Sequence, residues 1–153
     1  MNDVTVQTHR INAMGDQAIQ NVRALETMLM DLPQIPIVTN HVFHAGMYAR
    51  TVMIPAGSML TGALIKIATL LIVQGEALVY TDAGTITLCG YNVVPASAGR
   101  KQAFYAIQDT HLTMILTTSA DTVEKVESEF TDETELLVTR RSVKHQPPVI
   151  KGE

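Results

Sequence analysis

Glycines divide the middle of the chain into short apolar runs, and this spacing constrains the fold more than any other feature. Between residues 53 and 118 they recur about every nine residues, at Gly57, Gly62, Gly75, Gly84, Gly90 and Gly99. Short strands bounded by turn residues at such intervals are typical of an all-β sandwich or barrel. The sequence therefore predicts a small all-β domain over this segment.

The composition indicates one small acidic domain. The chain has 153 residues, a length that suits a single domain with its own core. Its net charge is −4, whereas a general nucleic-acid-binding surface needs clustered Lys and Arg, so we expect no nucleic-acid partner. Only 17% of the residues are charged. A neutral surface of this kind favours contacts with other subunits.

The chain shows no sign of a membrane or secretory destination. It starts with polar residues, so we expect no secretion signal. Its most apolar segment, residues 63–73, contains Lys66 and is too short to span a bilayer, so we expect no membrane partner. Cys89 is the single cysteine, and its place at the end of an apolar run predicts a buried, inert thiol. We expect a soluble protein kept in a reducing compartment.

A helix is predicted before the β region. Apolar residues recur at spacings of three and four between residues 15 and 32, and they form one helical face: Ile19, Val22, Leu25, Met28, Leu29 and Leu32. Asp16 is the predicted N-cap, and Pro33 ends the helix. We expect residues 1–36 to be an N-terminal arm with this amphipathic helix.

Residues 37–119 are expected to form the barrel. Two strands meet at residues 44–46, and an apolar strand covers residues 65–73. Two hairpins are predicted, with turns at residues 82–84 and at residues 108–110.

Residues 120–153 are expected to hold a short helix and an extended tail. Asp121 and Glu124 fit a capping box, and Val123, Val126 and Phe130 form the apolar face of the helix. An edge strand is predicted at residues 136–139. The acidic run on and after this helix is expected to face solvent.

Two sets of side chains are candidate binding groups. Arg50, Arg100 and Lys101, with Tyr48 and Tyr105, would form an anion pocket if the barrel mouth brings them together. His41 and His44 are weak metal-ligand candidates, because a spacing of three puts them on opposite faces of a strand. No histidine lies beside a Ser or Cys in a nucleophile arrangement, so no catalytic residue is assigned.

The glycine framework resembles the first motif of a cupin, an RmlC-like jelly roll in which histidines usually hold a metal. Gly62 opens this motif and Gly75 closes it, and Pro95 and Gly99 stand at the second turn. Where the family carries strand histidines, this chain has Ile65 and Thr69, and Gly99 is followed by Arg100, Lys101 and Gln102. The resemblance therefore implies a cupin-like barrel that has lost its metal-ligand histidines and binds no cofactor.

The resemblance is closer to small cupin-like proteins encoded in bacteriophage genomes, and it covers about residues 41–118. The matching residues are His41, Phe43, residues 46–50, residues 54–58, residues 99–101, Tyr105-Ala106 and residues 108–110. It implies a non-catalytic structural or assembly protein of a phage virion, either capsid-decorating or tail-associated. Such a protein would be a homo-oligomer, contact other phage structural proteins, and be assembled in the host cytoplasm.

Two other functions stay open. One is a cupin-type small-molecule or metal-binding protein or enzyme that uses His41, His44 and His111 as replacement ligands. The other is a cyclic-nucleotide-binding jelly roll, which needs a Gly-Glu loop followed by an Arg to hold the phosphate. Gly75-Glu76 is misplaced for that loop, so this function is the weakest of the three.

Overall fold

The computed structural model describes residues 9–137, 139 and 149–152. The elements in these residues are, in chain order, α1 (Asp16–Met30), β1 (Thr39–His44), β2 (Met47–Ile54), β3 (Met59–Thr61), β4 (Thr69–Thr81), β5 (Gly84–Ala96), β6 (Ala103–Ala106), β7 (Thr110–Thr117), α2 (Val123–Phe130), the 3-10 helix η1 (Thr134–Leu136) and β8 (Ile150–Lys151).

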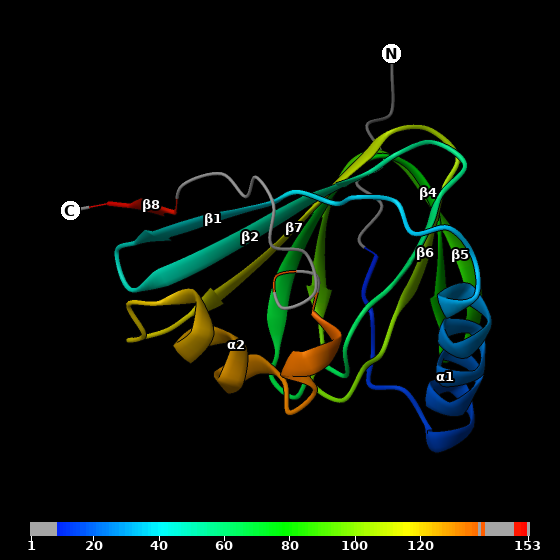
Figure 1. The fold of residues 1–153 in the computed structure, drawn as a ribbon, viewed down its shortest axis with the longest axis horizontal. Coiled ribbons are helices and arrows are strands. Elements are labelled where there is room, and N and C mark those ends of the chain that lie inside the picture. The colour runs from blue at the N-terminus through cyan, green and yellow to red at the C-terminus, as the bar shows by residue number, and fades with distance from the viewer. Residues whose placement is uncertain (1–8, 138, 140–148, 153) are drawn as a thin grey trace, which may run out of the picture.

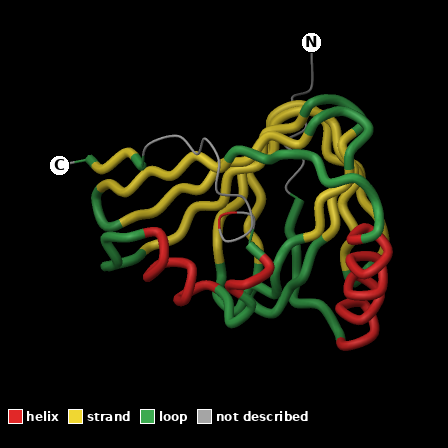
Figure 2. The backbone as a smooth tube through the Cα atoms, viewed as in Figure 1, coloured by secondary structure: helices red, strands yellow, loops and turns green. Residues whose placement is uncertain are grey.

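One curled sheet of eight strands forms the body of the protein, so the fold class is all-β with two helices, as predicted (Figures 1 and 2). The strand order is β3-β6-β4-β7-β2-β1-β8, and β5 pairs with β4. The two helices lie at different ends of the sheet, with α1 beside β5 and β6 and α2 beneath the ends of β2 and β7 (Figure 1).

Gly75 lies in the middle of β4, where this strand changes its pairing partner. The first half of β4 pairs with β7 and the second half with β6, whereas β5 follows β4 along its whole length. The chain crosses from β6 to β7 over Gly75, where a Cβ atom would lie 2.6 Å from the Asp109 carbonyl oxygen and 2.8 Å from the Thr110 Cα. The predicted hairpin at residues 108–110 is therefore wrong: β6 and β7 are consecutive, but both pair with β4.

The other predicted turns form as expected, but one strand starts later. β1 and β2 join at Ala45 and Gly46, both of which have positive φ (52° and 69°), and this geometry suits a tight hairpin. β4 and β5 form the hairpin predicted at residues 82–84, and it turns at residues 82–83. The strand predicted at residues 65–73 begins only at Thr69, because Ile65 makes an isolated bridge to Arg100.

The helix caps differ from the predicted ones. Gly15 is the N-cap of α1, and its N–H donates to the Asp82 Oδ1 (2.7 Å), so Asp16 is the first helical residue. Thr122 caps α2 by accepting from the Lys125 N–H. The strand predicted at residues 136–139 is wrong in its described part, which holds the end of η1 and the buried Leu137.

The core lies inside the curled sheet. Its fully buried members include Ile11, Tyr48, Val73, Val79 and Leu88. A smaller cluster of Met14, Ala18, Val22 and Ala103 joins α1 to the outer face of the sheet.

Cys89 is exposed, which corrects the prediction of a buried thiol. It follows the buried Leu88 in β5, and successive side chains of a strand point to opposite faces. Among the described residues, no helix is long and apolar enough to cross a bilayer. The residues predicted as terminal arms lie partly outside the described ones, at positions 1–8, 140–148 and 153.

Candidate binding site in the barrel interior

The concave face of the sheet encloses a cavity of about 130 Å³, called the inner cavity below. Its polar lining comes from the side chains of Arg50, Thr61, Arg100 and Gln102. The rest of its wall is made by Gly62 and by apolar residues: Val52, Leu60, Ala63, Ile65, Leu71, Phe104, Leu112, Met114, Phe130, Leu136 and Leu137. A polar cluster in an otherwise apolar hollow is the usual form of a small-molecule site.

Strand alternation aims two of these polar residues into the cavity. Residues 100–102 precede β6 in an extended segment, so Arg100 and Gln102 share one face and Lys101 takes the other. Lys101 instead binds the Glu26 carboxylate of α1 (3.1 Å) and the Gly62 carbonyl oxygen (2.9 Å). The segment thus places a cation and an amide inside the barrel and uses its middle residue to hold α1.

Arg100 is a buried cation whose partners are all neutral. Its guanidinium donates to the Thr69 hydroxyl (2.6 Å), to the Ser97 carbonyl oxygen (2.8 Å) and to the Gln102 Oε1 (3.1 Å), with longer contacts to two other carbonyl groups. No carboxylate pairs with it in the described part of the chain. Burial lowers the pKa of Arg100 to about 10, so the side chain stays charged at neutral pH.

Gln102 leaves a hydrogen-bond donor unused beside that cation. Its side chain is 6% exposed, and its Oε1 accepts from the Arg100 Nε. The Nε2 group has no hydrogen-bond partner among the described residues. Because an unsatisfied buried amide costs about 1–3 kcal/mol, such a group needs an explanation, and a ligand in the cavity supplies one.

A second buried polar network adjoins the cavity through Arg50. The Arg50 Nη1 donates to the Glu127 Oε2 (2.9 Å) and to the Tyr48 oxygen (3.3 Å). Tyr48 in turn lies 2.6 Å from the His41 Nδ1. The Tyr48 hydroxyl and the neutral imidazole of His41 thus share a hydrogen bond, in which the tautomer of His41 sets the donor. Burial raises the pKa of Tyr48, so the phenol stays protonated.

We expect this network to make the protein less stable in mild acid. Burial, and then the charge of Arg50, lowers the pKa of His41 from 6.5 to about 4. The unfolded chain therefore takes up a proton near pH 6.5 that the folded chain takes up only near pH 4. The stability contributed by neutral His41 is complete above pH 6.5 and is lost as pH falls toward 4, by about 3 kcal/mol.

Urea unfolding at pH 7 and pH 4.5 measures this effect. The His41→Gln variant is expected to lose less free energy of unfolding between the two pH values than the wild type does. His111→Gln, which changes an exposed histidine of β7, is the matched control and should keep the wild-type dependence. Identical pH dependence in all three proteins contradicts the assignment.

The residues predicted to form an anion pocket are only partly brought together. Arg50 and Arg100 both line the inner cavity, and Tyr48 contacts Arg50. Lys101 points to α1, and Tyr105 is 38% exposed on the outer face of β6. The polar cluster inside the barrel therefore consists of Arg50, Arg100, Tyr48 and Gln102.

The residues lining the cavity do not fit a metal ion. Transition metals in proteins are held by imidazole, thiolate or carboxylate groups, whereas this cavity offers two guanidinium cations, an amide and a threonine. Ile65 and Thr69 stand where the cupins that this chain resembles carry strand histidines. Ile65 lies in the apolar wall of the cavity, and the Thr69 hydroxyl accepts a hydrogen bond from Arg100. His41 is buried against Tyr48, His44 and His111 are exposed, and no cluster of metal-binding side chains exists among the described residues.

Two residues of this interior were missed by sequence reasoning. Glu127 was expected on a solvated helix face but is fully buried against Arg50. A signal existed, since Glu127 lies four residues after Val123 and three before Phe130, within the apolar stripe of α2. Gln102 was considered in the sequence only as a poor metal ligand. Its free hydrogen-bond donor became visible only in the structure, where Arg100 binds the Oε1 of the amide and leaves the Nε2 without a partner among the described residues.

The sheet curls around a small cavity that is lined by a few polar and many apolar side chains. No family model and no curated protein matches the chain. Similar structures include the ectoine synthase of P. lautus, at 15% identity over 65% of this chain and 75% of that chain, with a TM-score of 0.48.

Two further similar structures are cupin domains. The cupin domain of Schizosaccharomyces pombe Cnp3 has 21% identity over 65% of this chain and 71% of that chain, with a TM-score of 0.45. The cupin domain of an XRE family transcriptional regulator from Enterobacter cloacae has 13% identity over 56% of this chain and all of that chain (100%), with a TM-score of 0.46. At these identities the likeness concerns the fold alone.

Proposed function

We propose that this chain is a non-catalytic jelly-roll subunit that acts by assembling with copies of itself. The observation that supports this is an apolar strip on and after α1. Its side chains are about half exposed or more: Met28 (68%), Leu32 (57%), Met30 (52%), Ile35 (50%) and Val38 (48%). The apolar face predicted for the helix is thus covered by the sheet only at its first turns, where Ala18 and Val22 are buried.

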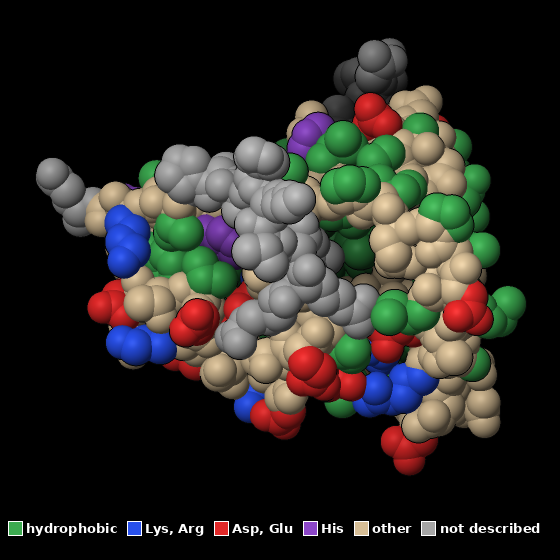
Figure 3. All heavy atoms as spheres, in the orientation of Figure 1, with side chains coloured by type: hydrophobic (Ala, Val, Ile, Leu, Met, Phe, Trp, Pro, Cys, Tyr) green, Lys and Arg blue, Asp and Glu red, His purple; other side chains and the backbone are tan. Residues whose placement is uncertain are grey.

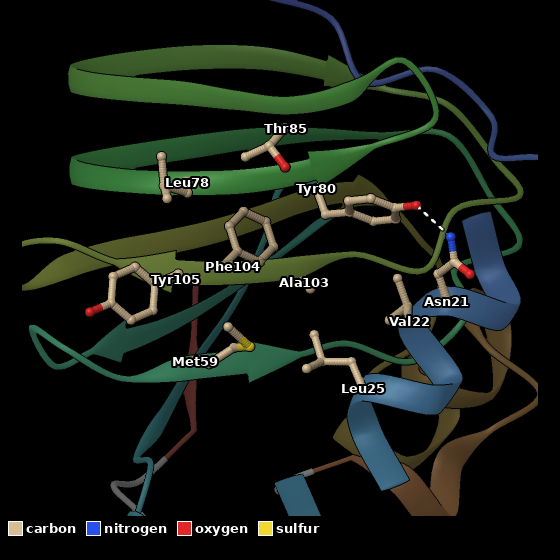
Figure 4. A pocket seen from close by; sticks show the side chains of 10 residues that line it. All are labelled: Asn21, Val22, Leu25, Met59, Leu78, Tyr80, Thr85, Ala103, Phe104 and Tyr105. Carbon is tan, nitrogen blue, oxygen red and sulfur yellow. Dashed lines mark hydrogen bonds between the residues drawn. The ribbon is translucent and has the colours of Figure 1, made fainter. Parts of the chain in front are cut away.

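An apolar groove lies beside this strip on the same side of the molecule. It has a volume of about 280 Å³ and runs between α1 and the outer face of the sheet (Figure 4). Val22 and Leu25 form its helix wall, and Met59, Phe104 and Tyr105 line the opposite side. Its one polar link is at the end, where the Asn21 side chain donates to the Tyr80 hydroxyl (3.0 Å).

The strip and the groove together favour a second copy of this chain as the occupant. A twofold contact brings the same surface of two subunits together, so that surface must be complementary to itself. Here exposed apolar side chains lie beside an apolar groove, and α1 contributes to both, so two copies can cover each other's apolar surface. Figure 3 shows hydrophobic side chains reaching the surface on the side where Figure 1 places α1 and β5.

The place of this subunit in a bacteriophage virion is part of the same proposal. It is supported by the resemblance of residues 41–118 to small cupin-like phage proteins, on the motifs quoted above. Other virion proteins would then be partners beside the second copy, and the particle would be assembled in the host cytoplasm. The net charge of −4 favours protein partners over nucleic acid.

Light scattering over a concentration series tests the assembly. We expect a weight-average mass at least twice the 16.7 kDa of one chain. The double variant Met28→Lys/Leu32→Lys should lower that mass toward one chain, since two buried charges would oppose the contact. Met47→Lys changes a methionine of similar exposure (45%) on β2 and is the matched control. A monomeric wild type, or a double variant that assembles as the wild type does, contradicts the proposal.

A second function, the binding of a small molecule inside the barrel, is favoured by a separate observation. The Gln102 Nε2 is a buried donor without a partner among the described residues, and Gln102 lines a cavity next to an uncompensated cation. Assembly and binding use different surfaces of the chain, so one does not exclude the other.

A further inference from the structure

We propose that the inner cavity binds a small monocarboxylate whose negative charge is balanced by Arg100. The proposal rests on the binding function just proposed and names its ligand class. It follows from the charge, the free donor and the shape of the cavity.

The charge balance of the interior calls for an anion. Arg50 and Glu127 form a pair at 2.9 Å, with side chains 10% and 0% exposed, and their charges cancel. Arg100 is 1% exposed and has only neutral partners. Among the described residues, one positive charge is thus left without a carboxylate partner, in an interior where the attraction between opposite charges is stronger than in water.

The free donor lies beside that charge. The Gln102 amide is fixed through its Oε1 by the Arg100 Nε at 3.1 Å, and its Nε2 has no partner among the described residues. A carboxylate oxygen accepts from an amide N–H. The N–H groups of Arg100 already have acceptors among its neighbours, the Met114 sulfur (3.8 Å) included, so Arg100 contributes its charge to the ligand and not a further hydrogen bond. One such oxygen satisfies the Gln102 donor while the ligand's charge offsets that of Arg100.

The size and the wall of the cavity limit the rest of the ligand. A volume of about 130 Å³ corresponds to roughly four water molecules at about 30 Å³ each. The wall opposite the polar groups is apolar, with Leu60, Leu71 and Phe104 among its members. These features favour one carboxylate on a short hydrocarbon body over phosphate, which has no apolar part, and over a dicarboxylate, which would bury a second charge.

Calorimetric titration of the wild-type protein with sodium butyrate, butyramide and inorganic phosphate tests the ligand class. We expect butyrate to bind and the other two to bind at least about tenfold more weakly, because the amide lacks the charge and phosphate lacks the apolar body. Equal binding of butyrate and butyramide overturns the carboxylate proposal but leaves the binding function standing. Absence of binding by all three overturns both, and tighter binding of phosphate overturns the proposed class.

Two variants test the site. Gln102→Glu is nearly isosteric and places an internal carboxylate beside Arg100, so it should abolish butyrate binding and raise the midpoint of thermal unfolding. Lys125→Met removes an exposed positive charge of α2 and should bind butyrate as the wild type does. Butyrate binding by Gln102→Glu at the wild-type affinity overturns the proposal. If that variant does not fold, the comparison of butyrate with butyramide in the wild type decides.

Discussion

Replacing Glu127 by alanine is expected to lower the free energy of unfolding by about 3–5 kcal/mol, the usual effect of removing one partner from a buried ion pair. Glu127 is fully buried on α2, and its Oε2 accepts from the Arg50 Nη1 at 2.9 Å and from the Thr139 hydroxyl. Without it, Arg50 and Arg100 leave two uncompensated cations around the inner cavity. Urea unfolding followed by circular dichroism measures the change.

Two control variants separate the ion pair from a general effect of mutating α2. The double variant Arg50→Met/Glu127→Leu removes both charges, so it should be much more stable than Glu127→Ala. Asp121→Ala breaks the exposed pair with Lys125 and should leave the unfolding transition where it is in the wild type. If Glu127→Ala behaves like Asp121→Ala, Glu127 does not compensate the buried arginine.

Gly75→Ala is expected to have the second large effect, a loss of about 3–5 kcal/mol or failure to fold. Gly75 has φ near +141°, and a Cβ atom there would meet the Asp109 carbonyl oxygen and the Thr110 side-chain oxygen, both at 2.6 Å. The Asp109 oxygen belongs to the backbone of the crossing from β6 to β7, so the clash requires that crossing to move. The yield of folded protein and the midpoint of thermal unfolding measure the effect.

Gly84 provides the matched control for this substitution. It also has positive φ (+110°), but nothing lies within 4 Å of a Cβ atom built on it. Gly84→Ala should therefore show the backbone strain alone, about 1–3 kcal/mol. Equal losses in the two variants would mean that the close approach of the crossing adds nothing to the cost of a side chain at Gly75.

The sequence predicts local structure well where turn residues and periodicity act alone. The β1–β2 and β4–β5 hairpins, the helix before the sheet and the apolar face of α2 all form as predicted. The pairing of β6 and β7 is different, because it depends on a contact across the sheet. A long β4 offers hydrogen bonds to both strands, and Gly75 lets the chain cross between them.

The candidate site is harder to predict, because its residues come together only through tertiary contacts. Alternation in an extended segment separates Lys101 from Arg100 and Gln102, but the sequence does not show which side faces the interior. Glu127 lies in the apolar stripe of α2, and its partner Arg50 is on β2, distant in sequence. Cys89 is a further example: the sequence does not show which face of β5 is buried, and in the structure Leu88 lies on the buried face and Cys89 on the exposed one.

We propose that Arg100 is the cation of the inner cavity and that this cavity binds no metal ion. Elemental analysis of protein purified without a tag tests the claim most directly. The donor set of the inner cavity, with two arginines, a glutamine and a threonine, predicts far less than one metal ion per chain. Iron, manganese, nickel or zinc present at one ion per chain, and lost together with the folded state on chelation, would contradict it.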